Sequence, residues 1–299
     1  MVNINTRNII KPKWDNEQVV HHILMRQLIP ILQPKLYRFS CGSVKGRGAH
    51  SLLKVMKSWV RSYNGKRFYV AELDIRKFYD NVKNDILKTK INRLIRDKRY
   101  NETLFKVIGD NNGIAKGNYT SPWLAHLYLM DMDNHILQDL KPDHYARYVD
   151  NMWLFSCNKK RLRRMVSDLN QYLFENLMLT IKSDWQVFRF DDTNGNGRAI
   201  NLLGFVVHRN RVCIRKSILK RIRAKANRVY NKGRTTIKDA CSIVSRLGYF
   251  KYSNAYRYYL RHIKTKISVR YLKRRIRNYM KRGKQHDRLE TSLGRRTAT

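Results

Sequence analysis

Acidic residues are scarce in this chain of 299 residues, in which 22 Asp and Glu stand against 63 Lys and Arg, a formal net charge of +41. An excess of one sign this large opposes compaction by self-repulsion, and a bound polyanion is its usual compensation. Hydrophobic residues make up 42% of the sequence, which favours a folded globule over a disordered chain. We therefore expect a folded protein whose principal partner is nucleic acid.

Cysteine and long apolar runs are also scarce. The four cysteines, Cys41, Cys157, Cys213 and Cys241, lie far apart without paired zinc spacing, so we expect reduced, buried thiols. No run approaches the ~18 apolar residues that a membrane-spanning helix needs. Residues 1–15 contain no apolar signal core, and no lipidation signal is present. We expect a soluble, cytoplasmic protein without membrane contact.

Two aspartates lie at the ends of apolar, strand-forming segments. Asp74 follows the run Phe68–Leu73, and Asp150 lies in a predicted hairpin, Tyr145–Phe155, with a polar turn at Asp150 and Asn151. An acidic residue at such a tip is costly unless a cation or solvent compensates it. Two Asp residues on adjacent strand ends can hold a pair of Mg²⁺ ions, which prefer oxygen ligands. Such a pair, ~4 Å apart, can activate a 3′-hydroxyl and stabilise a leaving pyrophosphate, which is polymerase chemistry.

Five motifs follow one another along the chain. Asp74–Tyr79 has an aromatic residue five positions after an Asp, Asn112–Ala125 contains a glycine turn and a Ser-Pro helix start, and Tyr148–Asn151 is similar to Tyr-x-Asp-Asp. Leu179–Val187 and Leu202–Phe205 are similar to a fourth motif and to a primer-grip hairpin. Each motif is weak by itself. In this order and at this spacing, the chain resembles prokaryotic reverse transcriptases through nearly its whole length.

Within that family, the chain is most similar to the reverse transcriptases of diversity-generating retroelements and of antiphage defence systems. Gly117–Ser121 resembles their Gly-Asn-x-Thr-Ser block, and Ile181–Val187 and Arg215–Ser217 also resemble the retroelement group. These segments do not separate the two groups. The resemblance implies a noncoding template RNA, nascent DNA and dNTPs as partners. An accessory protein or a homo-oligomer is also expected, because the chain is small and its surface strongly positive.

The resemblance implies an α+β fold of the right-hand polymerase type, with fingers, a ferredoxin-like palm and a helical thumb. In such a palm an antiparallel sheet packs on helices. The expected divisions are fingers at 1–66 and 83–111, palm at 67–82 and 112–210, thumb at 211–282, and a flexible basic tail at 283–299. From Arg211 onward the chain contains 28 Lys and Arg and three acidic residues, which suits a thumb that grips duplex backbone without reading its sequence.

The resemblance also assigns roles to particular side chains around the two aspartates. Asp74 and Asp150, with the Ile75 carbonyl group and Asn151, are expected to bind two Mg²⁺ ions, for which Mn²⁺ can substitute. Lys182 is a candidate proton donor to pyrophosphate, and an ordinary solvated lysine is the competing interpretation.

Further residues are expected at the nucleotide and at the nucleic acid. The expected dNTP contacts are Arg76, Lys77, Phe78, Tyr79, Lys116 and Gly117. Tyr79 would press on the sugar C2′ position and exclude a ribonucleotide by its extra hydroxyl. The expected template and primer contacts are Lys45, Arg47, Ser121, Pro122, Tyr148, Leu203, Gly204, Phe205, Arg215 and Lys216. Lys45 and Arg47 lie in a glycine-rich loop, Cys41–His50, whose backbone N–H groups suit phosphates.

The chain departs from the family pattern at three places. Asn151 replaces the second Asp of the third motif, and its amide oxygen can ligate Mg²⁺ but carries no charge. Lys116 replaces a Gln that touches the nascent base pair, so altered fidelity or template choice is expected. Few residues precede Lys11–Lys13, so we expect the nucleotide-binding strand pair of the fingers to be reduced.

Two other functions stay open at this point. The chain can be a catalytically silent, reverse-transcriptase-like scaffold that binds RNA, which the missing second Asp favours, or a two-metal nuclease.

Two helices are predicted with particular orientations. Periodicity predicts a helix over Glu17–Ile29, ended by Pro30, and a longer amphipathic helix over Ser121–Leu140. The apolar residues at helical intervals in the first are Val19, Val20, Ile23, Leu24 and Leu28. Asp131 and Asp133 in the second are additional candidates for metal ligands, and we interpret them as charges on the helix surface.

Overall fold

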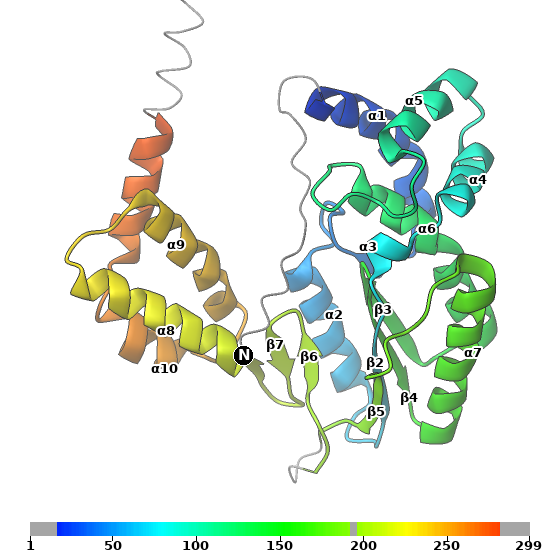
Figure 1. Cartoon of the computed structure of the whole chain (residues 1–299). Coiled ribbons are helices and arrows are strands. Elements are labelled where there is room, and N and C mark those ends of the chain that lie inside the picture. Colours follow the sequence, from blue (N-terminus) through cyan, green and yellow to red (C-terminus); the bar gives the residue numbers. More distant parts are fainter. Residues whose placement is uncertain (1–16, 192–195, 282–299) are drawn as a thin grey trace, which may run out of the picture. The chain divides into compact units, whose positions relative to one another are not determined.

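The structure, a computed structural model, describes residues 17–191 and 196–281 (Figure 1). The predicted basic tail at 283–299 and the segment before Glu17 lie outside the described residues. The chain divides into two compact units, Met1–Ile200 and Asn201–Thr299. The predicted thumb begins at 211, whereas this division also places the preceding strand residues from Asn201 in the second unit.

The first unit is built on a mixed five-stranded sheet. Its strands lie in the order β1-β3-β4-β2-β5, with the bounds β1 (Ser40–Cys41), β2 (Tyr69–Asp74), β3 (His144–Tyr148), β4 (Asn151–Ser156) and β5 (Gln186–Arg189). Strands β3, β4, β2 and β5 are antiparallel, as predicted. The edge strand β1 pairs parallel with β3, so the sheet is not wholly antiparallel.

Helices surround this sheet. They are α1 (Glu17–Leu32), α2 (Ala49–Ser62), α3 (Phe78–Asn81), α4 (Asn84–Leu94), α5 (Lys98–Ile108), α6 (Ser121–His135) and α7 (Lys159–Leu177), with a 3₁₀ turn η1 (Gln33–Lys35) and a π-helical end η2 (Ile136–Leu140) after α6. Leu154 of β4 lies in the core shared with α6 and α7, whereas Phe155 contacts Trp59 of α2 with ring centroids 5.7 Å apart. Successive strand residues point to opposite faces, so α7 and α2 cover opposite faces of the sheet (Figure 1).

Helix α1 differs from its prediction in length and in orientation. It continues through Pro30 to Leu32, and Leu28 and Leu32 are both fully buried. Val19 and Ile23, predicted on the inward face, are 51% and 55% exposed. Leu24 and Leu28 of the predicted stripe are buried, and the buried face continues through Met25 and Leu32 instead of Val19 and Ile23. The buried residues of α1 are His21, Leu24, Met25, Leu28 and Leu32.

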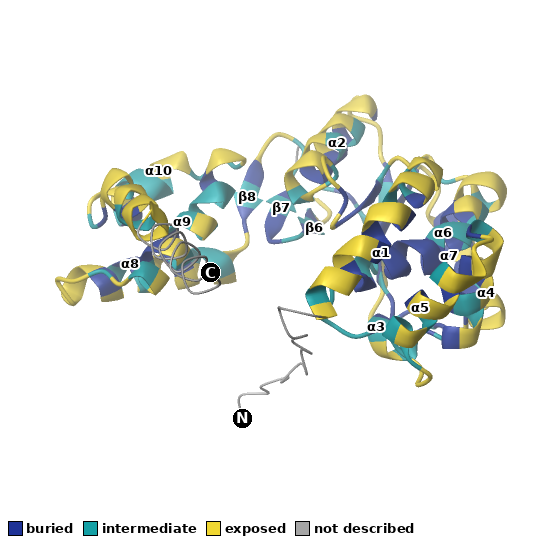
Figure 2. Cartoon of the chain, turned by 90° about the horizontal axis from the view of Figure 1, so that it is seen from above, coloured by how far each residue is buried: buried dark blue, intermediate teal, exposed yellow. Residues whose placement is uncertain are grey.

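The second unit is a small sheet followed by helices. Its elements are β6 (Ile200–Leu202), β7 (Phe205–Val207), β8 (Val212–Ile214), α8 (Lys216–Asn231), α9 (Ile237–Lys251), α10 (Tyr256–Tyr259) and the π-helical η3 (Leu260–Lys264), with helical residues again at 269–281. Apolar side chains of α8 and α9, with Ile263, Ile267 and Leu272, form its core. Much of the outer surface of these helices is exposed (Figure 2). Most basic residues of α8 are exposed, namely Lys216, Lys220, Arg221, Arg223 and Arg228.

The cysteines are only partly as predicted. All four are free, but Cys157 and Cys241 are exposed, and only Cys41 is buried. Within residues 17–191 and 196–281, no helix combines the length and the apolar character that crossing a membrane requires.

Gly204 lies at a close approach between the β6–β7 turn and two helices of the second unit. Its φ is +96°, and a Cβ there would lie 2.5 Å from Ile218 Cδ1 and 2.9 Å from the Tyr249 hydroxyl. The Gly204→Ala change is therefore expected to cost at least about 1 kcal/mol from backbone strain, plus the steric clash. Gly233→Ala is the matched control, because Gly233 has φ +65° and no atom within 4 Å of its added Cβ. Urea denaturation measures both, and equal losses would contradict the packing role.

Candidate active site

The backbone brings Asp74 and Asp150 together as predicted. In the β2–β4 pair, Asp74 lies opposite Asn151, and the Ile75 N–H donates a hydrogen bond to the Asp150 carbonyl oxygen at 3.3 Å. Asp74 ends β2, while Asp150 lies in the turn between β3 and β4. Sheet register alone therefore places the two acidic residues side by side.

The β3–β4 turn lies one residue earlier than predicted. Its two loop residues are Val149 and Asp150, and Asn151 is the first residue of β4. Val149 has φ 56°. A two-residue hairpin loop needs positive φ at its first position and favours glycine there, so a β-branched residue stores backbone strain. The Val149 N–H donates to the Cys41 carbonyl oxygen at 3.0 Å, which ties the turn to β1.

The electrostatics of the site are those of two crowded carboxyl groups. Burial, and next the negative charge of Asp74, raise the pKa of Asp150. The Lys182 ammonium group lies 2.6 Å from Asp74 Oδ2 and compensates part of this charge. The Asn151 amide nitrogen donates to Asp150 Oδ1 at 3.1 Å, a contact that a second Asp carboxylate could not make.

These residues fit a divalent cation. Asp74 Oδ1 is buried and has no hydrogen-bond partner, and a carboxylate oxygen of this kind is a ligand that Mg²⁺ prefers. Within the described part of the chain, no group of three or more His, Cys, Asp or Glu residues could hold a metal ion. The oxygen atoms that this site could offer a cation are therefore those of the two carboxylates and neutral ones such as those of Ile75 and Asn151.

The residues after Asp74 differ in their exposure. Tyr79 is half-buried, and burial followed by the charge of Asp150 raises the pKa of its hydroxyl to about 12, so the hydroxyl is neutral near pH 7. Arg76 and Lys77 are exposed. Phe78 is 2% exposed and belongs to the hydrophobic core, so its ring packs inside the protein instead of facing solvent.

The second motif lies against α3. The Lys116 ammonium group contacts both carboxylate oxygens of Asp80, at 2.6 and 2.7 Å. Gly117 is exposed and has φ 111°. The buried Ser121 hydroxyl donates to the Ala115 carbonyl oxygen at 2.5 Å, and Pro122 lies in the first turn of α6. These contacts hold the glycine turn in shape beside Tyr79.

The other residues predicted at template or primer fall in both units. In the first, Lys45 is exposed, Tyr148 is half-buried, and the Arg47 guanidinium group donates to the Tyr37 carbonyl oxygen at 3.1 Å. The members in the second unit are Leu203, half-buried, Gly204 and Phe205, buried, and Arg215 and Lys216, exposed at the start of α8. The structure gives Gly204 and Phe205 a packing role, since Phe205 lies against Tyr249 with ring centroids 5.0 Å apart.

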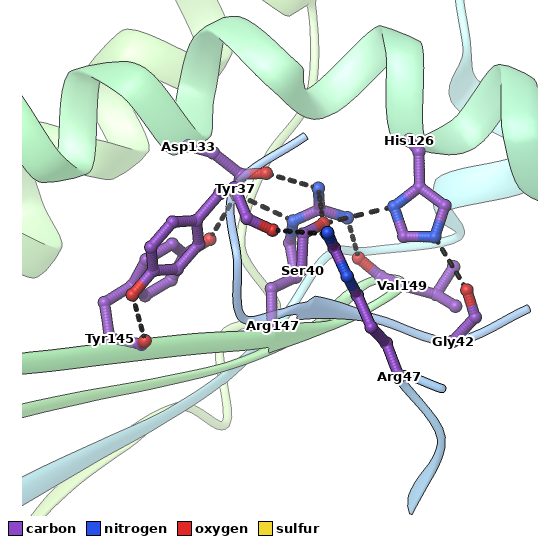
Figure 3. Close-up of polar contacts among 9 residues, drawn as sticks. All are labelled: Tyr37, Ser40, Gly42, Arg47, His126, Asp133, Tyr145, Arg147 and Val149. Atoms are coloured by element: carbon purple, nitrogen blue, oxygen red, sulfur yellow. Dashed lines mark hydrogen bonds and ion pairs between the residues drawn. The ribbon is translucent and has the colours of Figure 1, made fainter. Parts of the chain in front are cut away.

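A buried ion pair next to the site was not predicted from the sequence (Figure 3). Arg147 of β3 and Asp133 of α6 are 0% and 1% exposed, so the interpretation of Asp133 as a surface charge was wrong. Arg147 Nε lies 2.8 Å from Asp133 Oδ1, and Arg147 Nη2 lies 2.5 Å from Asp133 Oδ2. The Tyr145 hydroxyl donates to Asp133 Oδ1 at 2.6 Å. An arginine between the buried positions of a strand is the signal that could have indicated a buried acidic partner.

A histidine extends this polar cluster to the loop after β1. Ser40 Oγ accepts from Arg147 Nη2 at 2.6 Å and lies 3.1 Å from His126 Nδ1. His126 Nε2 lies 2.7 Å from the Gly42 carbonyl oxygen. A carbonyl oxygen only accepts, so Nε2 carries the proton and Nδ1 accepts from the Ser40 hydroxyl. Burial, and next the charge of Arg147, lower the pKa of His126 to about 4.

The fold is of the right-hand polymerase type, and the described palm sheet carries the two adjacent acidic residues. Residues 11–207 match the family "Reverse transcriptase (RNA-dependent DNA polymerase)". The chain belongs to this family, as its motifs predicted.

Similar proteins include intron-encoded proteins and telomerase. The chain is 29% identical over 119 residues to "Group II intron-encoded protein LtrA" of Lactococcus lactis subsp. cremoris, a match that covers 36% of this chain and 19% of that protein. It is 28% identical over 138 residues to "Uncharacterized 91 kDa protein in cob intron" of Schizosaccharomyces pombe, covering 42% and 16%. The chain thus spans less than a fifth of the length of these relatives.

A solved structure supports the fold. The structure of telomerase from Candida tropicalis in complex with a TWJ fragment of telomeric RNA matches with a TM-score of 0.52 at 10% identity, over 77% of this chain and 44% of that chain. At this identity the likeness shows the fold alone.

Removing the charge of Asp150 is expected to stabilise the chain when divalent cations are chelated. Its raised pKa means that the folded protein disfavours the carboxylate, so the gain in Asp150→Asn is present at neutral pH and vanishes as pH falls through that pKa. With Mg²⁺ at about ten times its Kd, the free energy of unfolding of the unchanged chain is expected to rise by about 1.4 kcal/mol. No such rise is expected for Asp150→Asn. Thermal denaturation with EDTA and with Mg²⁺ measures both effects. The exposed Asp168→Asn is the charge-matched control, and equal Mg²⁺ stabilisation of the two variants would contradict the site.

His126 is expected to make the chain sensitive to acid. Its pKa is about 4 in the folded state, below the ordinary histidine value of about 6.5, so between these two pH values the unfolded chain binds a proton that the folded chain does not. The free energy of unfolding therefore falls below pH 6.5, by about 3 kcal/mol when pH 4 is passed. In His126→Gln this component disappears. Urea denaturation at pH 7.5 and 4.5 measures it, and an unchanged pH dependence would show that His126 is not responsible.

Proposed function

We propose that the chain is an RNA-directed DNA polymerase that adds dNTPs at the site formed by Asp74 and Asp150. The observation that carries the proposal is the buried, unpartnered Asp74 Oδ1 beside a second carboxylate whose pKa is raised. Holding two partly buried carboxylates side by side destabilises the fold, and a bound cation would compensate their negative charge. Membership of the reverse transcriptase family supports the same reaction.

Asp74 and Asp150, with the Ile75 carbonyl oxygen and Asn151, would hold two Mg²⁺ ions, which Mn²⁺ can replace. When bound, such ions supply charge stabilisation to the attacking and leaving oxygens of an in-line displacement. Asp150 would bind a cation through its carboxylate form, whose charge the cation would compensate. Lys182 keeps the charge of Asp74 compensated and is the candidate to donate a proton to pyrophosphate.

The nucleotide would lie against α3 and the second motif. Tyr79, whose neutral hydroxyl lies near Asp150, would sterically exclude the 2′-hydroxyl group of a ribonucleotide. Arg76 and Lys77 are exposed cations next to Asp74, and exposed cations of this kind suit a triphosphate. Lys116, held by Asp80, and Gly117 are the further proposed dNTP contacts, and the family resemblance favours a contact between Lys116 and the nascent base pair.

The partners are proposed from charge and from sequence likeness. A net charge of +41 and the basic helices of the second unit suit an RNA template paired with nascent DNA. The blocks Gly117–Ser121 and Arg215–Ser217 favour a dedicated noncoding RNA in a bacterial or phage retroelement or an antiphage defence system. We also propose that the protein acts in the cytoplasm. It would associate there with an accessory protein or with a second copy of the chain.

A catalytically silent RNA-binding scaffold is the second candidate. Asn151 favours it, because this side chain adds no negative charge and donates its amide to Asp150. The scaffold would bind RNA with Asp150 serving only the structure of the turn.

Extension of a labelled DNA primer on an RNA template, with Mg²⁺ and dNTPs, tests the proposed activity. Incorporation is expected, with a loss of about a thousandfold or more in Asp74→Ala and in Asp150→Ala, since ligand loss forfeits several kcal/mol of charge stabilisation. Asp168→Ala on the exposed face of α7 serves as the control. RNA binding without any incorporation would favour the scaffold, and incorporation that survives Asp150→Ala would defeat the assignment of the site.

A further inference from the structure

We propose that Arg147 is a positioning residue for Asp150, which fixes the β3–β4 turn by joining the Val149 carbonyl oxygen to the buried carboxylate of Asp133. The inference deepens the proposed function, since it concerns the same metal-binding carboxylate. Arg147 itself touches neither Asp74 nor Asp150 in the contacts described above, so its effect on the site passes through the backbone of the turn.

The guanidinium group of Arg147 contacts three separate elements (Figure 3). Nε and Nη2 bind the two carboxylate oxygens of Asp133 on α6, and Nη2 also donates to Ser40 Oγ on β1. Nη1 is left for the Val149 carbonyl oxygen, to which it donates at 2.9 Å. Because a guanidinium group is planar and rigid, anchoring two of its nitrogens fixes the position of the third.

The turn needs this support because its backbone is strained. Val149 is a β-branched residue at φ 56°, and a relaxed alternative would move the residue that follows it, which is Asp150. Two contacts oppose that movement. The Val149 N–H is held by Cys41 at 3.0 Å, and the Val149 carbonyl oxygen is held by Arg147. The N–H and carbonyl groups of Val149 are thus both fixed by buried partners.

The surroundings make this support rigid. A Cβ added to Gly42 would lie 2.7 Å from Val149 Cγ2, so the residue after β1 is already in close contact with the turn. Ser40 Oγ accepts a hydrogen bond from Arg147 Nη2 and donates one to Nδ1 of the neutral His126. His126 Nε2 in turn donates to the Gly42 carbonyl oxygen. The hydrogen bonds therefore run in one direction from Arg147 to the loop beside Val149, and each buried donor in this series has an acceptor.

The Arg147→Lys variant tests the inference. Lysine keeps the positive charge beside Asp133 but has one compact ammonium group in place of the fork, so it cannot hold both Asp133 and the Val149 carbonyl oxygen. We expect the Kd for Mn²⁺, measured by electron paramagnetic resonance titration of the purified chain, to rise about tenfold or more, as for other residues that orient metal ligands. The half-saturating Mg²⁺ concentration for dNTP incorporation is expected to rise in parallel.

Tyr145→Phe is the matched control. It removes a buried hydrogen bond to the same Asp133 carboxylate, 2.6 Å long, but the Tyr145 hydroxyl does not contact Val149. A purely structural role of the cluster would make both variants lose Mn²⁺ affinity in proportion to their loss of thermal stability. We expect the Kd for Mn²⁺ to be unchanged in Tyr145→Phe, measured at a temperature where both variants are folded by circular dichroism.

The outcomes separate this inference from the proposed function. Unchanged Mn²⁺ affinity in Arg147→Lys, an equal loss in Tyr145→Phe, or equal binding by the unchanged chain and Asp150→Ala would each overturn it. If no dNTP is incorporated but Arg147→Lys still weakens Mn²⁺ binding, the polymerase proposal fails and the inference stands. If Arg147→Lys does not fold, Ser40→Ala removes one anchor of the guanidinium group. A rise of about threefold in the Kd for Mn²⁺ is then expected, and no rise would overturn the inference.

Discussion

The first unit depends on the pairing of β2 with β4, which forces two acidic residues into one place. Asp74 lies opposite Asn151, directly beside the turn that carries Asp150, and the sheet cannot change this without a shift of register. Such a shift would exchange the residues of β4 between the face covered by α7 and the face covered by α2, and would break the packing on both. Apolar burial along the strands thus provides the free energy that keeps two mutually repelling carboxyl groups together. The surrounding lysine and amide groups moderate the repulsion, and a bound cation would complete the compensation.

Asn151 has a different meaning in the structure from the one that a motif comparison gives it. As a missing carboxylate, it suggests a weakened metal site. In the fold, its amide nitrogen donates to Asp150 Oδ1, and this contact favours the charged form of Asp150. The same substitution therefore removes one negative charge and helps to keep a neighbouring carboxylate ionised.

The sequence predicted what depends on local alternation and on motif order. The strand before Asp74, the hairpin around Asp150 and the adjacency of the two residues follow from apolar periodicity and from the family pattern. The side of α1 that faces the core could not be predicted from periodicity, because the burial of Met25 and Leu32 depends on packing partners far away in the sequence. The partner of Arg147 did not follow either, because an Asp on a helix looks like an ordinary surface charge until the strand that it faces is known.

The ion pair between Arg147 and Asp133 also determines which elements would have to be transferred together if this candidate site were grafted onto another protein. The hairpin that carries Asp150 is short and continuous in the chain, which makes it attractive for grafting onto a new scaffold. Transferred alone, it would bring a guanidinium group that is 0% exposed and leave its counter-ion behind on α6. An uncompensated buried charge of this kind costs several kcal/mol. A transplantable unit therefore has to include α6 and the Ser40 strand together with the hairpin.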